Sequence, residues 1–194
     1  RLKKKSFIKA IEFCSTTGKS AFKVYCLGYH GINLIKAQGK KLLGATRFIN
    51  EKPSSEIKKQ LATNQLLSQL LLRYGGAFQN STLFQAKQAF LWTNTFTDKT
   101  GKVYFIESVR RCSEWQQQIK QIKEKANRCA SIIDSYRNLD TPLPYRPTLL
   151  IAAEDAQHVL ELQSVIKTTR LRKKDVLYSY DSLIYNDIKH AFFK

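Results

Sequence analysis

The sequence predicts an α/β fold with a mixed central sheet. From about residue 55 onward, the expected order is helix, strands, long helix, strand, helix, strand. This alternation is typical of a sheet that is covered by helices. A length of 194 residues allows a main domain plus a fragment of a second one. We expect an N-terminal unit over 1–50 and the α/β domain over 51–194.

The N-terminal unit has the pattern of part of a winged helix. The strand-like run "KVYCL" follows a turn signal at Gly18 and precedes a break at "GYHG". We therefore expect a strand, a turn, a second strand and a short helix, with a lysine-tipped wing that can lie along a phosphate backbone. The chain begins at Arg1 and contains no methionine, so we expect the winged helix to be incomplete at its N-terminus.

The first half of the α/β domain is predicted to hold one helix and a strand meander. Leucines recur at helical spacing over 55–73, and Gly75-Gly76 ends that helix. Alternating apolar and polar residues over 77–110, divided by the turn "DKTG", predict two or three antiparallel strands.

The second half is predicted to alternate helices and buried strands. The longest helix is expected over 113–138, with Ser113 and Gln116 as a capping box. The apolar run "TLLIAAE" predicts a strand that is buried on both faces. A helix capped by Asp155 or a neighbour follows it, and then come the short strand "DVLYSY" and a final helix or irregular tail.

Charge gives the strongest indication of a partner. The chain has 33 lysines and arginines against 15 acids, a net charge of +18, and residues 1–50 carry 11 basic residues and one acid. A field of this size favours polyanions, so DNA is the expected partner. No apolar run is long enough to span a bilayer, so no membrane partner is expected. We expect phosphate contacts from Lys3, Lys4, Lys5, Lys19, Lys23, His30, Arg110, Arg111, Arg170, Arg172, Lys173 and Lys174.

Cofactor and metal motifs are missing from the sequence. The four cysteines form no CxxC pair, and the three histidines have no metal-ligand spacing. Glycine-rich phosphate loops and a GxSxG elbow are absent as well. We expect no cofactor, no metal site, and reduced cysteines in a cytoplasmic protein.

The strand-rich segment raises the question of nuclease chemistry. The topology suggests a restriction-endonuclease-like core, in which an Asp and a Glu-x-Lys on adjacent strands hold a divalent metal. Here the second strand supplies Glu107, but Val109 stands at the lysine position, and Asn94 stands at the expected Asp position. An amide lacks the charge that a Mg²⁺ site needs. No catalytic residue is assigned; if the chain were active with Mg²⁺, the candidate acids would be Glu107, Asp98 and Glu114.

Three stretches resemble the plasmid replication-relaxation family. "KVYCLGYHGINLI" is similar to the family's wing, and "LATNQLLSQLLLR" is similar to its first core helix. "YFIESVRRCSEW" resembles the strand and helix start that carry the family's acids, keeping Glu107 and Glu114 but placing Val109 at the family's Asp. The resemblance implies a winged helix joined to a restriction-endonuclease-like core, in a protein of plasmid or mobile-element replication or transfer.

The departures from the family pattern remove charged groups and keep the apolar scaffold. This pattern favours a pseudo-nuclease, kept as a DNA-binding accessory protein. Two alternatives stay open. One is a metal-dependent DNA nickase or relaxase. The other is a protein-interaction module that forms a homodimer or binds other plasmid replication or transfer proteins.

Overall fold

The computed structural model describes residues 8–14, 21–27, 29–38, 54–86, 89–186 and 190–193. The chain divides into two compact units, Arg1–Ile57 and Lys58–Lys194. This division lies in the first turn of helix α2 (Ser54–Tyr74), close to the boundary predicted at 50/51. Each unit is described by itself.

The first unit contains two strands and a helix. Strands β1 (Ile8–Cys14) and β2 (Ala21–Leu27) pair in antiparallel orientation, with Ile8 opposite Leu27 and Cys14 opposite Ala21. Helix α1 (Tyr29–Ala37) follows. The order strand, strand, short helix is the one expected from the sequence, and the winged-helix assignment stays a prediction.

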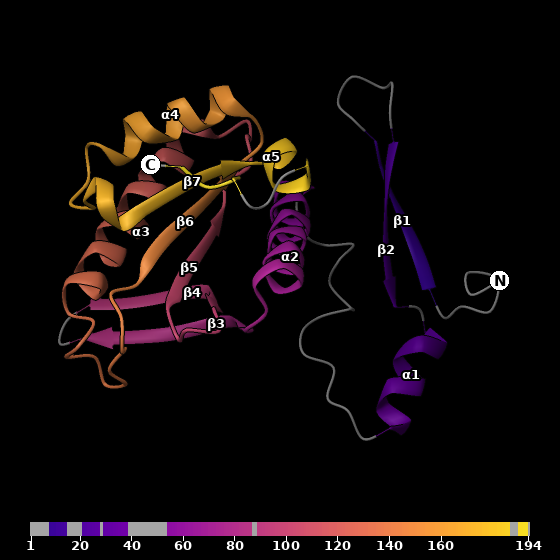
Figure 1. The fold of residues 1–194 in the computed structure, drawn as a ribbon. Coiled ribbons are helices and arrows are strands. Elements are labelled where there is room, and N and C mark those ends of the chain that lie inside the picture. The colour runs from indigo at the N-terminus through magenta and orange to yellow at the C-terminus, as the bar shows by residue number, and fades with distance from the viewer. Residues whose placement is uncertain are drawn as a thin grey trace. The chain divides into compact units, whose positions relative to one another are not determined.

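The second unit is built on a five-stranded mixed sheet. Its spatial order follows the chain, β3-β4-β5-β6-β7 (Figure 1). The first three strands are antiparallel and the last two add in parallel, so the predicted α/β class with a mixed sheet is confirmed. The strands are β3 (Ala77–Ala86), β4 (Ala89–Thr97), β5 (Val103–Ser108), β6 (Thr148–Ala153) and β7 (Val176–Tyr180).

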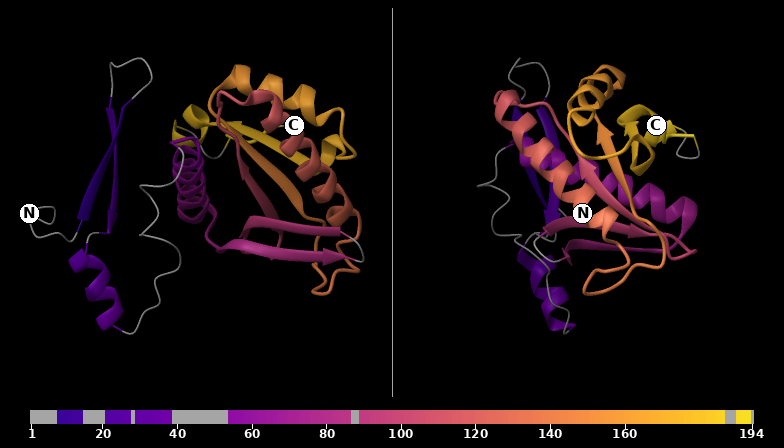
Figure 2. Two further views of the ribbon diagram at one scale, coloured as in Figure 1. Left: turned by 180° about the vertical axis from the view of Figure 1, so that it is seen from behind. Right: turned by 90° about the vertical axis from the view of Figure 1, so that its left-hand side faces the viewer.

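Helices cover both faces of this sheet (Figures 1 and 2). Helices α3 (Trp115–Asp134) and α4 (Ala156–Ile166) lie on one face, because each joins two parallel strands and must cross over the sheet. Helices α2 and α5 (Asp181–Asn186) lie on the other face. No helix in the described ranges is long and apolar enough to cross a bilayer.

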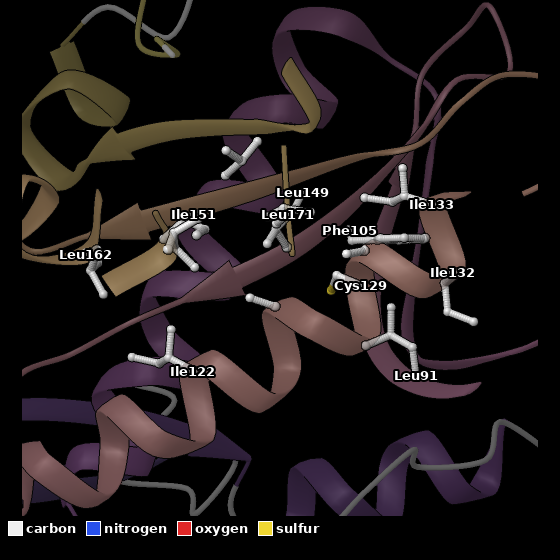
Figure 3. Close-up of a cluster of buried hydrophobic side chains, with 14 of the residues drawn as sticks. Leu91, Phe105, Ile122, Cys129, Ile132, Ile133, Leu149, Ile151, Leu162 and Leu171 are labelled. Carbon is white, nitrogen blue, oxygen red and sulfur yellow. The ribbon is translucent and has the colours of Figure 1, made fainter. Parts of the chain in front are cut away.

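Two apolar clusters hold the layers together. The larger one lies between the sheet and the α3–α4 layer and includes Phe105, Cys129 and Ile151 (Figure 3). The smaller one joins α2 to the opposite face through Leu66, Phe96 and other side chains. All six residues of β6 are buried, as the continuous apolar run predicts.

The start of α3 differs from the prediction. The helix begins at Trp115 with Glu114 at the N-cap position, and no side chain accepts a capping hydrogen bond there, so the predicted capping box of Ser113 and Gln116 is wrong. Helix α4 follows its prediction, because the Asp155 side chain accepts a hydrogen bond from the backbone N–H of His158.

Candidate functional site

Glu107 lies in a small pocket at the C-terminal end of β5. Its side chain is only 12% exposed, and its two oxygens accept hydrogen bonds from the ammonium groups of Lys59 on α2 and Lys125 on α3. The pocket has a volume of about 170 Å³. Its remaining lining is mixed, with Gln118 and Gln121 as polar members and with Val109, Ile122, Ile151 and other apolar side chains.

The two lysines decide the ionisation of Glu107. Burial by itself would raise the pKa of this carboxyl group, but the ammonium groups of Lys125 and Lys59 outweigh burial and hold the pKa below its ordinary value. Glu107 is therefore a carboxylate at neutral pH. The two ammonium groups together carry +2, which is the charge that a divalent metal would bring to a carboxylate.

Asn94 does not face Glu107, contrary to the sequence-based interpretation. It pairs with Ile106, whose side chain belongs to the α2 cluster, whereas the neighbouring Phe105 belongs to the α3–α4 cluster. Because side chains alternate along a strand, Asn94 and Glu107 project from opposite faces of the sheet. The Asn94 Oδ1 atom accepts a hydrogen bond from the backbone N–H of Ser81, 3.1 Å away, at a bulge where Ser81 has φ 52°. Asn94 thus stabilises the hairpin.

Neither of the two other candidate acids lines this pocket. Asp98 organises the β4–β5 turn, where its Oδ1 atom accepts hydrogen bonds from the Thr100 N–H, the Thr100 hydroxyl and the Lys102 N–H. Asp98 lies opposite Lys102, just before β5, which puts it about 16 Å along the strand from Glu107. Glu114 is exposed at the start of α3. Within the described ranges, no three metal-ligating side chains come together.

Arg110 is buried, which argues against the predicted contact with DNA. Its side chain is 5% exposed. The guanidinium donates to the Val109 carbonyl oxygen at 3.0 Å and to Asp181 Oδ1 at 2.7 Å. Arg110 therefore ties the end of β5 to the start of α5, because a buried guanidinium needs an acidic partner.

Two more of the predicted DNA contacts bind acids of the chain itself. Arg111 donates to both oxygens of Asp155 and also reaches Glu161. This hydrogen bonding lowers the pKa of Asp155 to about 2. Arg172 binds Asp175 and Asp134, and Arg146 binds the same two carboxylates. These arginines are held in ion pairs that fix α4 and the segment before β7.

The outer surface of the α3–α4 layer carries basic side chains without such partners. The backbone N–H of Arg170 donates to Asn127 Oδ1 at 2.9 Å, which joins the segment after α4 to the middle of α3. Glu124 on α3 offsets one positive charge. We name these side chains the basic face: Lys120, Lys123, Arg128, Lys167, Arg170, Lys173 and Lys174. Among the described residues, no acid forms an ion pair with any member of the basic face.

The remaining predicted contacts belong to the first unit. Lys3, Lys4, Lys5 and Lys19 lie outside the described residues. Lys23 is in β2, and its side chain is not described. His30 is exposed on α1 with its ring 5.5 Å from the ring of Tyr29. The proposal that these residues contact DNA therefore rests on the sequence.

A buried histidine near Arg111 makes stability depend on pH. Burial lowers the pKa of His158, and the positive charge of Arg111 acts in the same direction. The Nδ1 atom of His158 accepts the backbone N–H of Glu154 at 3.4 Å, so a proton on Nδ1 would face another donor. The neutral ring is therefore the form that the fold stabilises.

We expect the free energy of unfolding to fall as the pH drops from 7.5 through 6. His158 has a pKa of about 6.5 in the unfolded chain and a lower pKa in the folded chain. Below this range the unfolded chain binds one more proton than the folded chain, so a lower pH favours unfolding. Thermal unfolding followed by circular dichroism at each pH measures this. His158→Gln should flatten the pH dependence. An equal slope in the His158 variant and the wild type would contradict the prediction.

The fold and the site together define an α/β unit with one carboxylate locked by two lysines and with a basic outer surface. No protein-family model, curated protein or solved structure matches this chain. The chemistry available at these residues is the binding of anions by ammonium and guanidinium groups.

Proposed function

We propose that the chain is a DNA-binding protein and that its α/β unit binds the phosphate backbone through the basic face. The observation that carries the proposal is how charge is distributed in this unit. Four acids are held by arginines of the chain: Asp134, Asp155, Asp175 and Asp181. The basic face has no such ion pairs with acids in the described part of the chain, so its charge is available to a polyanion.

The pocket around Glu107 supports binding without cleavage. Lys59 and Lys125 already neutralise the carboxylate, and they occupy both of its oxygens. A metal ion would have to displace two ammonium groups, and the described residues that line the pocket include no second acid. We therefore propose that this pocket is a vacated nuclease site.

The resemblance to the plasmid replication-relaxation family supports a narrower proposal. We propose that the protein is a DNA-binding accessory factor in the replication or transfer of a plasmid or other mobile element. DNA is the partner on which this depends, and other proteins of the replication or transfer complex are further partners. The nickase alternative requires a metal site, and the arrangement of the acids argues against it.

Binding of a short DNA duplex by the full chain is expected to weaken steeply as salt rises. Each phosphate that a lysine or arginine neutralises adds about −0.9 to the slope of log K against log salt concentration. With the basic face engaged, the slope should therefore be about −4 or steeper. Fluorescence anisotropy of a labelled duplex over a salt series measures it. Absence of binding at low salt, or binding that is insensitive to salt, would overturn the proposal.

Incubation of the chain with supercoiled plasmid and Mg²⁺ or Mn²⁺ is expected to leave the plasmid intact. The reason is that Glu107 stands alone as an acid in its pocket and is bound by two lysines. Agarose gels of the plasmid provide the measurement, with Glu107→Ala as the matched control. Nicking by the wild type that Glu107→Ala abolishes would establish the nickase alternative.

A further inference from the structure

The β3–β4 hairpin exposes a row of large apolar side chains. Trp92 is 63% exposed, Phe90 is 49% exposed and Leu83 is 41% exposed. Leu83 pairs with Trp92 across the hairpin, and Gln85 pairs with Phe90. We name Leu83, Phe90 and Trp92 the aromatic hairpin face.

The three side chains lie on one face of the sheet. Residues alternate along β4: Leu91 belongs to the cluster under α3 and α4, whereas Phe96 belongs to the cluster under α2. Phe90 and Trp92 are in phase with Phe96 and therefore project from the same face as it does. Helix α2 covers that face at Phe96, which is 1% exposed, and leaves it bare at Trp92 and Phe90.

Strand β3 leaves the end of α2 and runs away from it, and β4 returns, so the half of the hairpin that holds Gln85 and Phe90 lies away from α2 (Figure 1). The backbone N–H of Asp140 donates to the Gln85 carbonyl oxygen at 3.3 Å, so this half of the hairpin stands beside the segment after α3. The pairing of β4 with β5 stops at Asn94 opposite Ile106, so Trp92 and Phe90 lie in the half of β4 that pairs with β3 alone.

We propose that the aromatic hairpin face binds unpaired bases of single-stranded DNA by stacking them on Trp92 and Phe90. This inference rests on the proposed DNA binding and adds the form of DNA that the α/β unit recognises. Exposed aromatic rings on a sheet surface stack bases of any sequence, and nearby cations hold the phosphates. The net charge of +18 supplies the attraction for the phosphates.

Charge favours nucleic acid over a second copy of the chain as the occupant. A chain with a net charge of +18 repels itself, and the same charge attracts a polyanion. Gln85, which pairs with Phe90 on the same face, is a neutral hydrogen-bonding group beside the rings and can pair with base edges. A single strand presents bare base faces, whereas a duplex hides them in its stack.

The experiment titrates the full chain with oligothymidine of about 12 nucleotides, a length within the site size of single-strand binders. The sequence holds two tryptophans, so Trp115→Phe leaves Trp92 as the only one, and stacking should quench its fluorescence. Trp92→Ala should lower the affinity for oligothymidine on the order of 10-fold, while salt-dependent duplex binding stays within about twofold. Trp92→Phe should restore part of the affinity, because phenylalanine can still stack.

Tyr185→Ala serves as the matched control, because this aromatic residue on α5 is 72% exposed and outside the hairpin. If Trp92→Ala binds oligothymidine as tightly as Tyr185→Ala does, stacking is overturned while the proposed duplex binding stands. Sedimentation offers a second test. If the wild type is a dimer, Trp92→Ala is a monomer, and oligothymidine does not quench the Trp92 fluorescence, the face binds a second copy of the chain and base stacking is overturned. If neither oligothymidine nor duplex binds at low salt, the proposed function itself fails.

Discussion

Replacing both Lys59 and Lys125 by methionine is expected to lower the free energy of unfolding by roughly 3 kcal/mol at pH 7. The double variant leaves the Glu107 carboxylate, 12% exposed, without either of its cationic partners. Such a carboxylate must stay charged in a poorly solvated pocket or take up a proton, and both options cost free energy. Urea unfolding followed by circular dichroism gives the value.

Adding Glu107→Gln to the double variant should recover most of the lost stability, because no charge then stays buried. Glu107→Gln alone should cost less than the double variant, about 1 kcal/mol, since the partly exposed lysines can turn toward water. The deficit of the double variant should also shrink as the pH falls toward 4. As the pH falls toward 4, Glu107 in the wild type, whose pKa is lowered, begins to lose its stabilising contribution. In the double variant, Glu107 takes up a proton and is no longer a buried charge. A double variant as stable as the wild type, or no recovery in the triple variant, would contradict this role.

The sequence predicts the order of elements well because each element depends on local pattern. The alternation over 77–110 predicts strands in this region, and the continuous apolar run at 148–154 predicts a buried strand. The start of α3 is different. Ser113 and Gln116 have the right identity and spacing for a capping box, but α3 begins later, at Trp115, whose ring packs 5.5 Å from that of His158. Tertiary packing at this end outweighs the local signal.

The site could be predicted only in part, since it depends on contacts between distant segments. Glu107 stands out in the sequence as a lone acid in an apolar strand. Its partner Lys59 precedes it by 48 positions, and no local pattern connects the two. Lys125 gives a weak signal, since it lies beside the buried stripe that includes Ile122 and Cys129. The burial of Arg110 depends on Asp181, which is 71 positions away.

Neutralising three members of the basic face is expected to weaken duplex binding on the order of 100-fold at about 0.1 M salt. The variant combines Arg170→Gln, Lys173→Gln and Lys174→Gln, all at exposed positions after α4. Each lost phosphate contact removes about 0.9 from the salt slope, so the slope should become less steep by about 2.7. Stability should hardly change, because these side chains form no ion pair within the described part of the chain.

A control with equal loss of charge separates a located surface from a general effect of net charge. Arg73→Gln, Lys99→Gln and Arg137→Gln also remove three positive charges, at exposed positions at the end of α2, after β4 and after α3 respectively. If the basic face holds the duplex, this control should lose less than about fivefold in affinity and keep most of the wild-type slope. Equal losses in the two variants would mean that DNA responds to the overall charge of +18, and the basic face would then be no specific interface.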